Sequence, residues 1–208
     1  MSASSWRVSR DGPVTRFALA SPDGRQTLSP EILEELQRGV ARAGAEGASV
    51  VVVESARPGL FAAGADLGAI RELTPVQGYF YARRGQEALQ SLSRSLCVVV
   101  AEIDGACYGG ALDLAMACRV RIATDRATFC HPGPRLGIVT GWGGTLFVRR
   151  STRVGTARRV FRAGEVFAAE TARELGLVDE VVAEGSWRRR TGEIEAALVQ
   201  ASRFLSFG

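Results

Sequence analysis

Four consecutive valines, Val50 to Val53, constrain the fold of this chain more than any other feature. β-Branched residues favour strands, and apolar residues at odd and even positions alike indicate a strand over residues 48–54 that is buried on both faces, as in a parallel sheet. A helix precedes this strand, because Ser29 suits an N-cap, Pro30 suits the first helical position and apolar residues follow at helical spacing. The order helix then buried strand predicts a β-α-β unit.

The same alternation extends in both directions along the chain. Two strand-like runs, 6–9 and 14–20, flank a turn signal and predict a hairpin before the helix. The remaining pattern predicts strands at 98–103, 120–124 and 128–130, and helices at 76–96, from near Gly110, and at 143–150, 156–161, 168–175 and 186–204. Strands early and helices late indicate one α/β domain with a helical C-terminal region.

Composition excludes several classes of protein. The 208 residues are 46% apolar and 23% charged, which suits a folded domain with a sizeable core. No stretch approaches the roughly 18 apolar residues of a membrane helix, and the N-terminus lacks the apolar core of a secretory signal, so a cytoplasmic protein is expected. The net charge of +4 is spread along the chain, and residues 188–190 resemble a solvated helix face, so neither nucleic acid nor a membrane is an expected partner.

The four cysteines, Cys97, Cys107, Cys118 and Cys130, form no CxxC pair and lie in apolar surroundings. This pattern predicts buried thiols in place of disulfides or metal ligands. No metal site is expected.

Two glycine clusters follow predicted strands. The first is FAAGADL at residues 61–67, and the second, Gly109-Gly110, opens a helix. Glycine permits close backbone approach, and amides at a helix N-terminus suit a developing oxyanion. Each cluster also suits an ordinary tight strand-to-helix turn. Neither supplies the GxGxxG pattern between a first strand and its helix that a Rossmann dinucleotide-binding fold requires.

Four segments in order carry a family resemblance over nearly the whole chain: FAAGADL, IDGACYGGALDLAMACRVRIAT, FCHPGPRLGIVTGWGGT and RAGEVFAAETARELGLVDEVV. Together they resemble the enoyl-CoA hydratase/isomerase family, also called the crotonase superfamily. The resemblance implies an α/β fold with a ββα spiral core over residues 1–185 and a C-terminal helix over 186–208. That helical region is shorter than in the family, so a more open site or a truncated paralogue is expected.

The resemblance also implies chemistry on an acyl-CoA thioester. The backbone N–H groups of Ala65 and Gly110 would form an oxyanion hole for the thioester carbonyl. Of the two glutamates that hydratases of this family use, the first aligns with Asp113, a shorter carboxylate, and the second aligns with Gly133. The expected reaction is hydration or isomerisation of an enoyl-CoA, with Asp113 as the leading acid/base.

Nearby residues are candidates to replace the missing glutamate. His131 lies two positions before Gly133, and an extended backbone would point it to the same side. The alternative is a histidine held by hydrogen bonds beneath the loop. Thr140 and Trp142 lie on the loop that covers the acyl group, and Trp142 is expected to be a pocket wall.

A second resemblance concerns Gly133 itself. The segment HPGPRLG is similar to one in 1,4-dihydroxy-2-naphthoyl-CoA synthases, where glycine also replaces the glutamate and some members seat bicarbonate as a base. The aspartate that those enzymes carry further on aligns with Thr140. The alternatives are therefore enolate chemistry of the naphthoyl-CoA synthase or decarboxylase type, or a catalytically silent acyl-CoA binder.

Coenzyme A enters these predictions as part of the substrate, with its adenine near Ala63 and Ala65 and its phosphates near Arg25. Asp66 is interpreted as a helix cap at this edge of the site. The family resemblance further implies a homo-oligomer, a trimer or a hexamer. The complete expected CoA-contact set is Arg25, Ala63, Ala65, Asp66 and Leu67.

Overall fold

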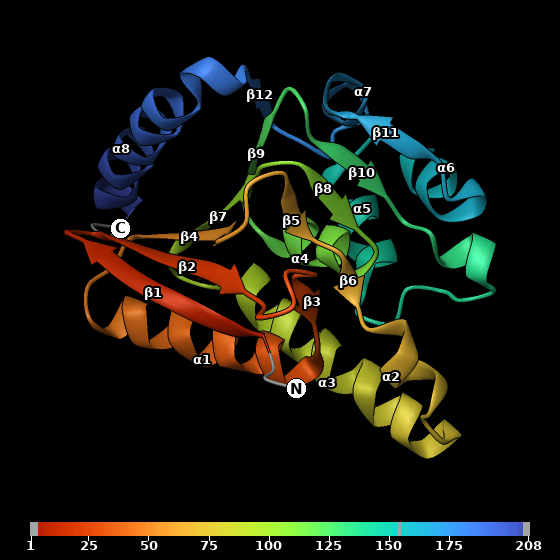
Figure 1. Cartoon of the computed structure of the whole chain (residues 1–208). Helices are drawn as coiled ribbons and strands as arrows, with labels where there is room; N and C mark the ends of the chain where they lie inside the picture. Colours follow the sequence, from red (N-terminus) through yellow and green to blue (C-terminus); the bar gives the residue numbers. More distant parts are fainter. Residues whose placement is uncertain (1–3, 154, 206–208) are drawn as a thin grey trace.

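The computed structural model describes residues 4–153 and 155–205, and a six-stranded sheet forms its centre (Figure 1). The strand order is β1-β2-β4-β7-β9-β12. The predicted hairpin is confirmed, since β1 and β2 are antiparallel, and every later strand joins the sheet in parallel. The six strands are β1 (Ser5–Asp11), β2 (Val14–Ala20), β4 (Val50–Ser55), β7 (Val98–Ile103), β9 (Val120–Thr124) and β12 (Glu180–Val182).

A smaller sheet lies beside the first, in the order β11-β10-β8-β5. Strands β5, β8 and β10 are parallel, and β11 is antiparallel to β10. A further short parallel pair joins β3 to β6. These strands are β5 (Leu60–Ala62), β8 (Ala106–Tyr108), β10 (Thr128–Cys130), β11 (Val166–Ala168), β3 (Thr27–Leu28) and β6 (Gly64–Ala65).

The chain passes from the large sheet to the small one three times. Strand β4 leads to β5, β7 to β8 and β9 to β10, each after a short connection. Helix α4 follows β8 directly, and a 3-10 turn follows β10. Because β5, β8 and β10 are neighbours in one parallel sheet, the segments after their carboxyl ends meet at one edge. This ββα repetition agrees with the spiral core that the family resemblance implies.

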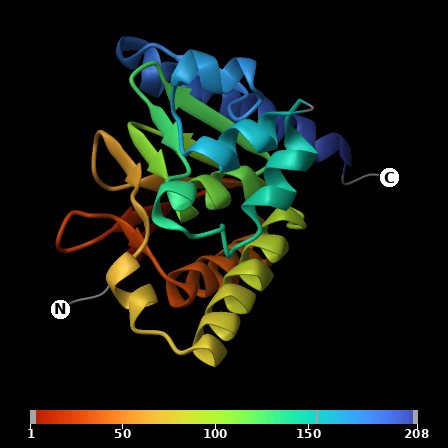
Figure 2. The same cartoon turned by 90° about the vertical axis from the view of Figure 1, so that its right-hand side faces the viewer.

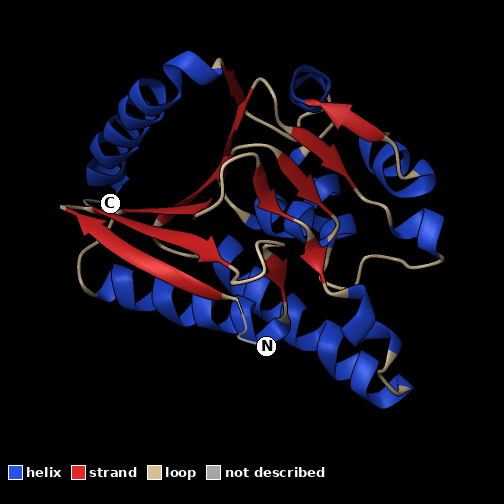
Figure 3. Cartoon of the chain, viewed as in Figure 1, coloured by secondary structure: helices blue, strands red, loops and turns tan. Residues whose placement is uncertain are grey.

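Helices cover both sides of the large sheet. Helices α1 and α3 pack on one side, and α8 lies on the other, as Figures 1 and 3 show. Figure 2 shows α2 and the start of α3 projecting at one end. The helices are α1 (Pro30–Ala45), α2 (Leu67–Arg71), α3 (Pro75–Ser93), α4 (Gly110–Ala117), η1 (Gly133–Leu136), α5 (Gly144–Ser151), α6 (Thr156–Ala163), α7 (Ala169–Glu174), η2 (Glu184–Ser186) and α8 (Trp187–Leu205).

The valine strand is buried on both faces, as predicted. Val51 and Val53 belong to the main core under α1 and α3. Val50 and Val52 point to the other face, where Trp187 of α8 packs against the same apolar cluster. The alternation of strand side chains therefore places successive valines in two separate apolar layers.

A group of charges lies between the large sheet and α8. Arg16 of β2 pairs with Glu54 at 3.6 Å, with Glu102 at 3.5 Å and with Glu195 of α8 at 2.5 Å. Glu102 is 2% exposed. Burial, followed by the hydrogen bond and charge of Glu195, raises the pKa of Glu102 to about 8. One arginine thus faces three carboxyl groups, and proton binding by Glu102 relieves part of the excess negative charge.

Most predicted element positions are confirmed. Ser29 caps α1 through a hydrogen bond from the Ile32 amide at 3.4 Å, whereas the helix predicted to reach residue 96 ends at Ser93. Strands β3, β5, β6, β8, β11 and β12 are not predicted, because runs of two or three residues carry little periodic signal, whereas the equally short strand predicted at 128–130 is confirmed as β10. The predicted division at residue 185 falls within η2 and stays a prediction.

The four cysteines are buried thiols, in agreement with their apolar sequence surroundings. No helix among residues 4–153 and 155–205 is long and apolar enough to cross a membrane. Within the same ranges, no group of three or more metal-ligating side chains is placed to hold a metal ion.

Candidate active site

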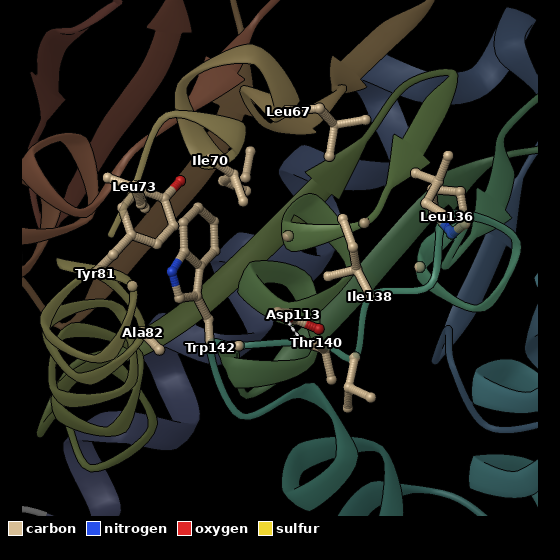
Figure 4. A pocket seen from close by; sticks show the side chains of 18 of the residues that line it. Leu67, Ile70, Leu73, Tyr81, Ala82, Asp113, Leu136, Ile138, Thr140 and Trp142 are labelled. Carbon is tan, nitrogen blue, oxygen red and sulfur yellow. Dashed lines mark hydrogen bonds between the residues drawn. The ribbon is translucent and has the colours of Figure 1, made fainter. Parts of the chain in front are cut away.

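A cavity of about 460 Å³ opens where β6, α4, the start of α3 and the segment after β10 converge (Figure 4). Its walls are mainly apolar, and its polar side chains are Thr74, Tyr81, Asp113, His131 and Thr140. Figure 4 shows Leu67, Ile70 and Leu73 on one side of it and Leu136 and Ile138 on another. The site residues expected from the sequence fall largely here: Ala63, Ala65, Leu67, Gly110, Asp113, His131 and Gly133.

The two glycine clusters meet at one wall of this cavity. Gly64 has φ +89°, and a Cβ there would lie 2.6 Å from the Tyr108 carbonyl oxygen and 2.9 Å from the Gly110 nitrogen. Only a residue without a side chain allows β6 to lie this close to the start of α4. Gly110 is the first residue of α4, so its N–H has no acceptor within the helix. Ala65 and Gly110 are thereby brought to the same wall.

Asp113 lies in the first turn of α4 and is 2% exposed. The Thr140 hydroxyl donates a hydrogen bond to Asp113 Oδ2, drawn as the dashed line in Figure 4. Oδ1 is buried without a hydrogen-bond partner among the described residues. Burial raises the pKa of Asp113 to about 7, and the Thr140 hydrogen bond opposes that rise. The carboxyl group therefore exists in both protonation states near neutral pH.

His131 is the second titratable group at this point. Its Nε2 lies 3.6 Å from Asp113 Oδ1, and its ring meets the Phe161 ring edge-on with centroids 5.0 Å apart. Its Nδ1 is buried without a hydrogen-bond partner among the described residues, so none of them holds this atom by a hydrogen bond. Burial lowers the pKa of His131 to about 4, which leaves the ring neutral at pH 7.

The predicted geometry around Gly133 requires a correction. Pro132, the N-cap of the 3-10 turn η1, has helical angles, φ −72° and ψ −7°, so the backbone is not extended from His131 to Gly133. His131 nevertheless lines the cavity. A Cβ at Gly133 would lie 2.4 Å from the Ile138 carbonyl oxygen and 3.1 Å from His131 Nδ1. The backbone of the following loop therefore lies where a side chain at this position would begin.

Trp142 forms a wall of the cavity, as predicted, and is 3% exposed. Its indole stacks on the Tyr81 ring at 5.6 Å with an interplanar angle of 29° (Figure 4). A Cβ at Gly85 of α3 or at Gly110 of α4 would lie 2.2 Å or 2.4 Å from indole atoms. Two glycines on separate helices thus create the slot that holds this ring.

The expected CoA contacts divide into two groups. Ala63, Ala65 and Leu67 line the cavity, and Asp66 caps α2 through hydrogen bonds from Gly68 N at 2.8 Å and Ala69 N at 3.3 Å. Arg25 lies outside the cavity lining and pairs with the neighbouring Asp23 carboxylate at 2.8 Å. The helix-cap interpretation is confirmed, whereas the CoA contacts stay predictions.

Three residues that shape this site were not singled out individually from the sequence: Tyr81, Gly85 and Gly144. A Cβ at Gly144 would lie 1.8 Å from Asp113 Oδ1, so this glycine makes room for the buried carboxyl group. The adjacent Gly143-Gly144 pair was visible in the sequence, but its partner was not. Tyr81 and Gly85 carry no local signal, since both lie within an ordinary helical pattern.

Solved structures with the same architecture come from several organisms. An enoyl-CoA hydratase from Bacillus anthracis is 28% identical with a TM-score of 0.86, and the match covers 93% of this chain and 76% of that one. DspI from Pseudomonas aeruginosa is 28% identical with a TM-score of 0.88, covering 96% and 84% of the two chains. An enoyl-CoA hydratase from Thermoplasma volcanium is 27% identical with a TM-score of 0.87, covering 97% and 80%.

The sequence itself matches a family model. Residues 10–206 match the model described as enoyl-CoA hydratase/isomerase, and this range contains every site residue named above. The agreement of this match with the crotonase-type fold of the solved structures shows that the chain belongs to the enoyl-CoA hydratase/isomerase family.

Proposed function

We propose that this protein binds an acyl-CoA thioester and catalyses enolate-forming proton transfer, the hydration or isomerisation of an enoyl-CoA, with Asp113 as acid/base. One observation carries the proposal. The Asp113 carboxyl group is buried at the floor of the cavity with Oδ1 unpartnered among the described residues and 3.6 Å from His131 Nε2. Unsatisfied buried polar atoms are rare in structural roles and typical of sites where a substrate supplies the missing partner.

The backbone at the adjacent wall supplies the complementary part of the chemistry. The N–H groups of Ala65 and Gly110 would donate to the thioester carbonyl oxygen, which becomes negative when an α proton is removed. Donors fixed before the reaction stabilise that charge without reorganising, and loss of one oxyanion-hole donor typically costs about 3 to 4 kcal/mol of barrier. The close approach of Gly64 to the Gly110 nitrogen supports this role.

The two reactions make different demands on the carboxyl group. In isomerisation, Asp113 takes a proton from one carbon of the allylic system and returns it to another, so one group suffices. In hydration, the water oxygen bonds to Cβ while a proton is delivered to Cα, and a second group that orients the water is an advantage. Neutral His131, beside Asp113 Oδ1, is the residue that we assign to that second task.

The cavity lining favours these reactions over the alternatives. None of the described residues that line it is an arginine or a lysine, so no cation there pairs with a carboxylate on the acyl group. Decarboxylation and naphthoyl-type ring closure both start from carboxylated acyl groups, and an apolar enoyl chain suits this lining better. Thr140 aligns with the aspartate that naphthoyl-CoA synthases carry, and its hydroxyl donates a hydrogen bond to Asp113.

The central experiment uses purified protein with crotonyl-CoA and with a 3-enoyl-CoA. Loss or gain of the conjugated enoyl absorbance reports hydration or isomerisation, and α-proton exchange in heavy water reports enolate formation. Asp113→Asn is expected to lower turnover by about 10²- to 10⁴-fold, while Asp125→Asn, at an exposed turn outside the cavity, leaves it unchanged. Tight CoA-ester binding without turnover or exchange would replace the proposal by a silent binder.

Two further expectations are tested with the same material. The bicarbonate implied by the glycine at position 133 is tested by adding the anion, and faster turnover would indicate that it acts as a base. A homo-oligomer, a trimer or a hexamer, is proposed from family membership, and light scattering during size-exclusion chromatography measures the mass directly.

A further inference from the structure

The loop between η1 and α5 is tied to the rest of the cavity at several points. Gln86 of α3 donates to the Gly141 carbonyl oxygen at 2.7 Å, and Trp142 is held in its slot against Tyr81. Thr140 lies between these anchors and the exposed Val139, and its hydroxyl donates a hydrogen bond to Asp113 Oδ2. The hydroxyl position is therefore set by packing on α3.

The two oxygens of Asp113 consequently have different surroundings. Oδ2 accepts the Thr140 hydrogen bond, whereas Oδ1 faces His131 Nε2 at 3.6 Å and has no partner among the described residues. Gly144 admits this arrangement, because a Cβ there would overlap Oδ1 at 1.8 Å. A carboxyl group free to rotate would have two equivalent oxygens, and this one does not.

We infer that Thr140 is a positioning residue for Asp113, and that its hydroxyl holds Oδ2 so that Oδ1, on the His131 side, is the oxygen that exchanges a proton with the thioester substrate. This inference rests on the proposed function. A hydroxyl that donates to a carboxylate stabilises its ionised form, so Thr140 also counteracts the effect of burial on Asp113. The other titratable groups near Asp113 among the described residues are His131 and the buried Cys107 thiol, whose pKa is raised well above its usual value chiefly by burial.

Thr140→Val keeps the shape of the side chain and removes the donor, and Thr140→Ser keeps the donor. Loss of a hydrogen bond to a charged group is expected to raise the pKa of Asp113 by about one to two units in the valine variant. The serine variant should retain the wild-type value. Thr140→Ala, which cannot overfill the site, provides a second variant without the hydroxyl group.

The primary readout is the pKa of Asp113 from the carboxyl ¹³C chemical shift, assigned with Asp113→Asn, and it needs no turnover. The kinetic readout is kcat against pH. The acidic limb of this profile should move to higher pH in the valine variant and return to its wild-type position in the serine variant, and KM should change less than kcat. An unchanged Asp113 pKa in both hydroxyl-free variants, or a serine variant that behaves like valine, would overturn the inference. Failure of wild-type turnover would instead refute the proposed function, and the chemical-shift result would still decide the role of Thr140.

Discussion

Gly144→Ala is the substitution that most directly tests the arrangement around Asp113. The added methyl group would begin 1.8 Å from Asp113 Oδ1, 2.7 Å from its Cγ and 3.3 Å from Thr140 Oγ1. Ordinary carbon–oxygen contacts are above about 3 Å, so the carboxyl group must move by roughly 1 Å or more, away from α5. The side chain has little freedom to absorb this change, since Asp113 has only two side-chain torsions and is 2% exposed.

This displacement has separable effects on activity and stability. A misplacement of about 1 Å at a reacting group costs on the order of 10²-fold in rate. Adding one methyl group to a packed interior costs about 1–3 kcal/mol of unfolding free energy. Binding of the CoA portion should change little, because the overlap is with the carboxyl group alone, so kcat is expected to fall far more than KM rises.

The assay compares initial rates with an enoyl-CoA for wild type, Gly144→Ala and a matched control, Gly192→Ala. Gly192 lies in α8 with no heavy atom within 4 Å of an added Cβ, so the control should keep full activity and gain slightly in helix stability. Urea unfolding of each variant shows that the fold is retained at the assay temperature. A Gly144→Ala variant with kcat within about twofold of wild type would refute either the placement of Asp113 or its role.

Three other predictions concern neighbouring parts of the molecule. Gly133→Glu, which restores the family's second glutamate, should fail to increase hydration of crotonyl-CoA, because its Cβ would lie 2.4 Å from the Ile138 carbonyl oxygen; a faster variant would contradict this. Gly85→Ala should displace the Trp142 ring and thereby shift the preference for acyl-chain length. This preference is measured as kcat/KM across a series of enoyl-CoA substrates, and an unchanged preference would exclude Trp142 as a wall that selects the chain. Glu102 binds its proton more tightly when folded, with a pKa of about 8 against an ordinary 4.5, so its contribution to stability is complete below pH 4.5 and is lost as pH rises through 8. Urea unfolding from pH 5 to 8.5 should show the free energy of unfolding of the wild type falling by up to about 1.4 kcal/mol per pH unit, and a smaller fall in Glu102→Gln. Parallel pH profiles for the two proteins would refute this assignment of the pH dependence to Glu102.

The sequence alone predicted the parallel α/β core with good accuracy. The valine run, the hairpin and the Ser29-Pro30 helix start are local patterns, and local patterns report whether a segment is buried on one face or two. The short strands β6 and β8 carry no such pattern, although β6 contains Ala65 and β8 leads to Gly110. Family resemblance, not periodicity, supplied the ββα repetition.

The residues of the site could also be predicted from the sequence more readily than their geometry could. The family resemblance indicated Ala65, Gly110 and Asp113, and the position of His131 relative to Gly133 indicated the histidine. The structure places all four around one cavity. The expected extended backbone beside His131 was wrong, because Pro132 has helical angles as the N-cap of η1. The direction of a side chain near a proline depends on torsion angles that a spacing argument does not contain.

What the sequence determined by itself is the set of residue types: small residues at the strand ends, one carboxyl group in the first turn of α4 and one histidine after β10. What only the tertiary structure decided is which of their atoms face one another. Thr140 contacts Asp113 across 27 positions of sequence, and Gly144 leaves the space that this contact requires. Burial then sets the protonation of both Asp113 and His131, and burial is a property of the whole fold, because every packed element removes part of the water that would otherwise stabilise a charge.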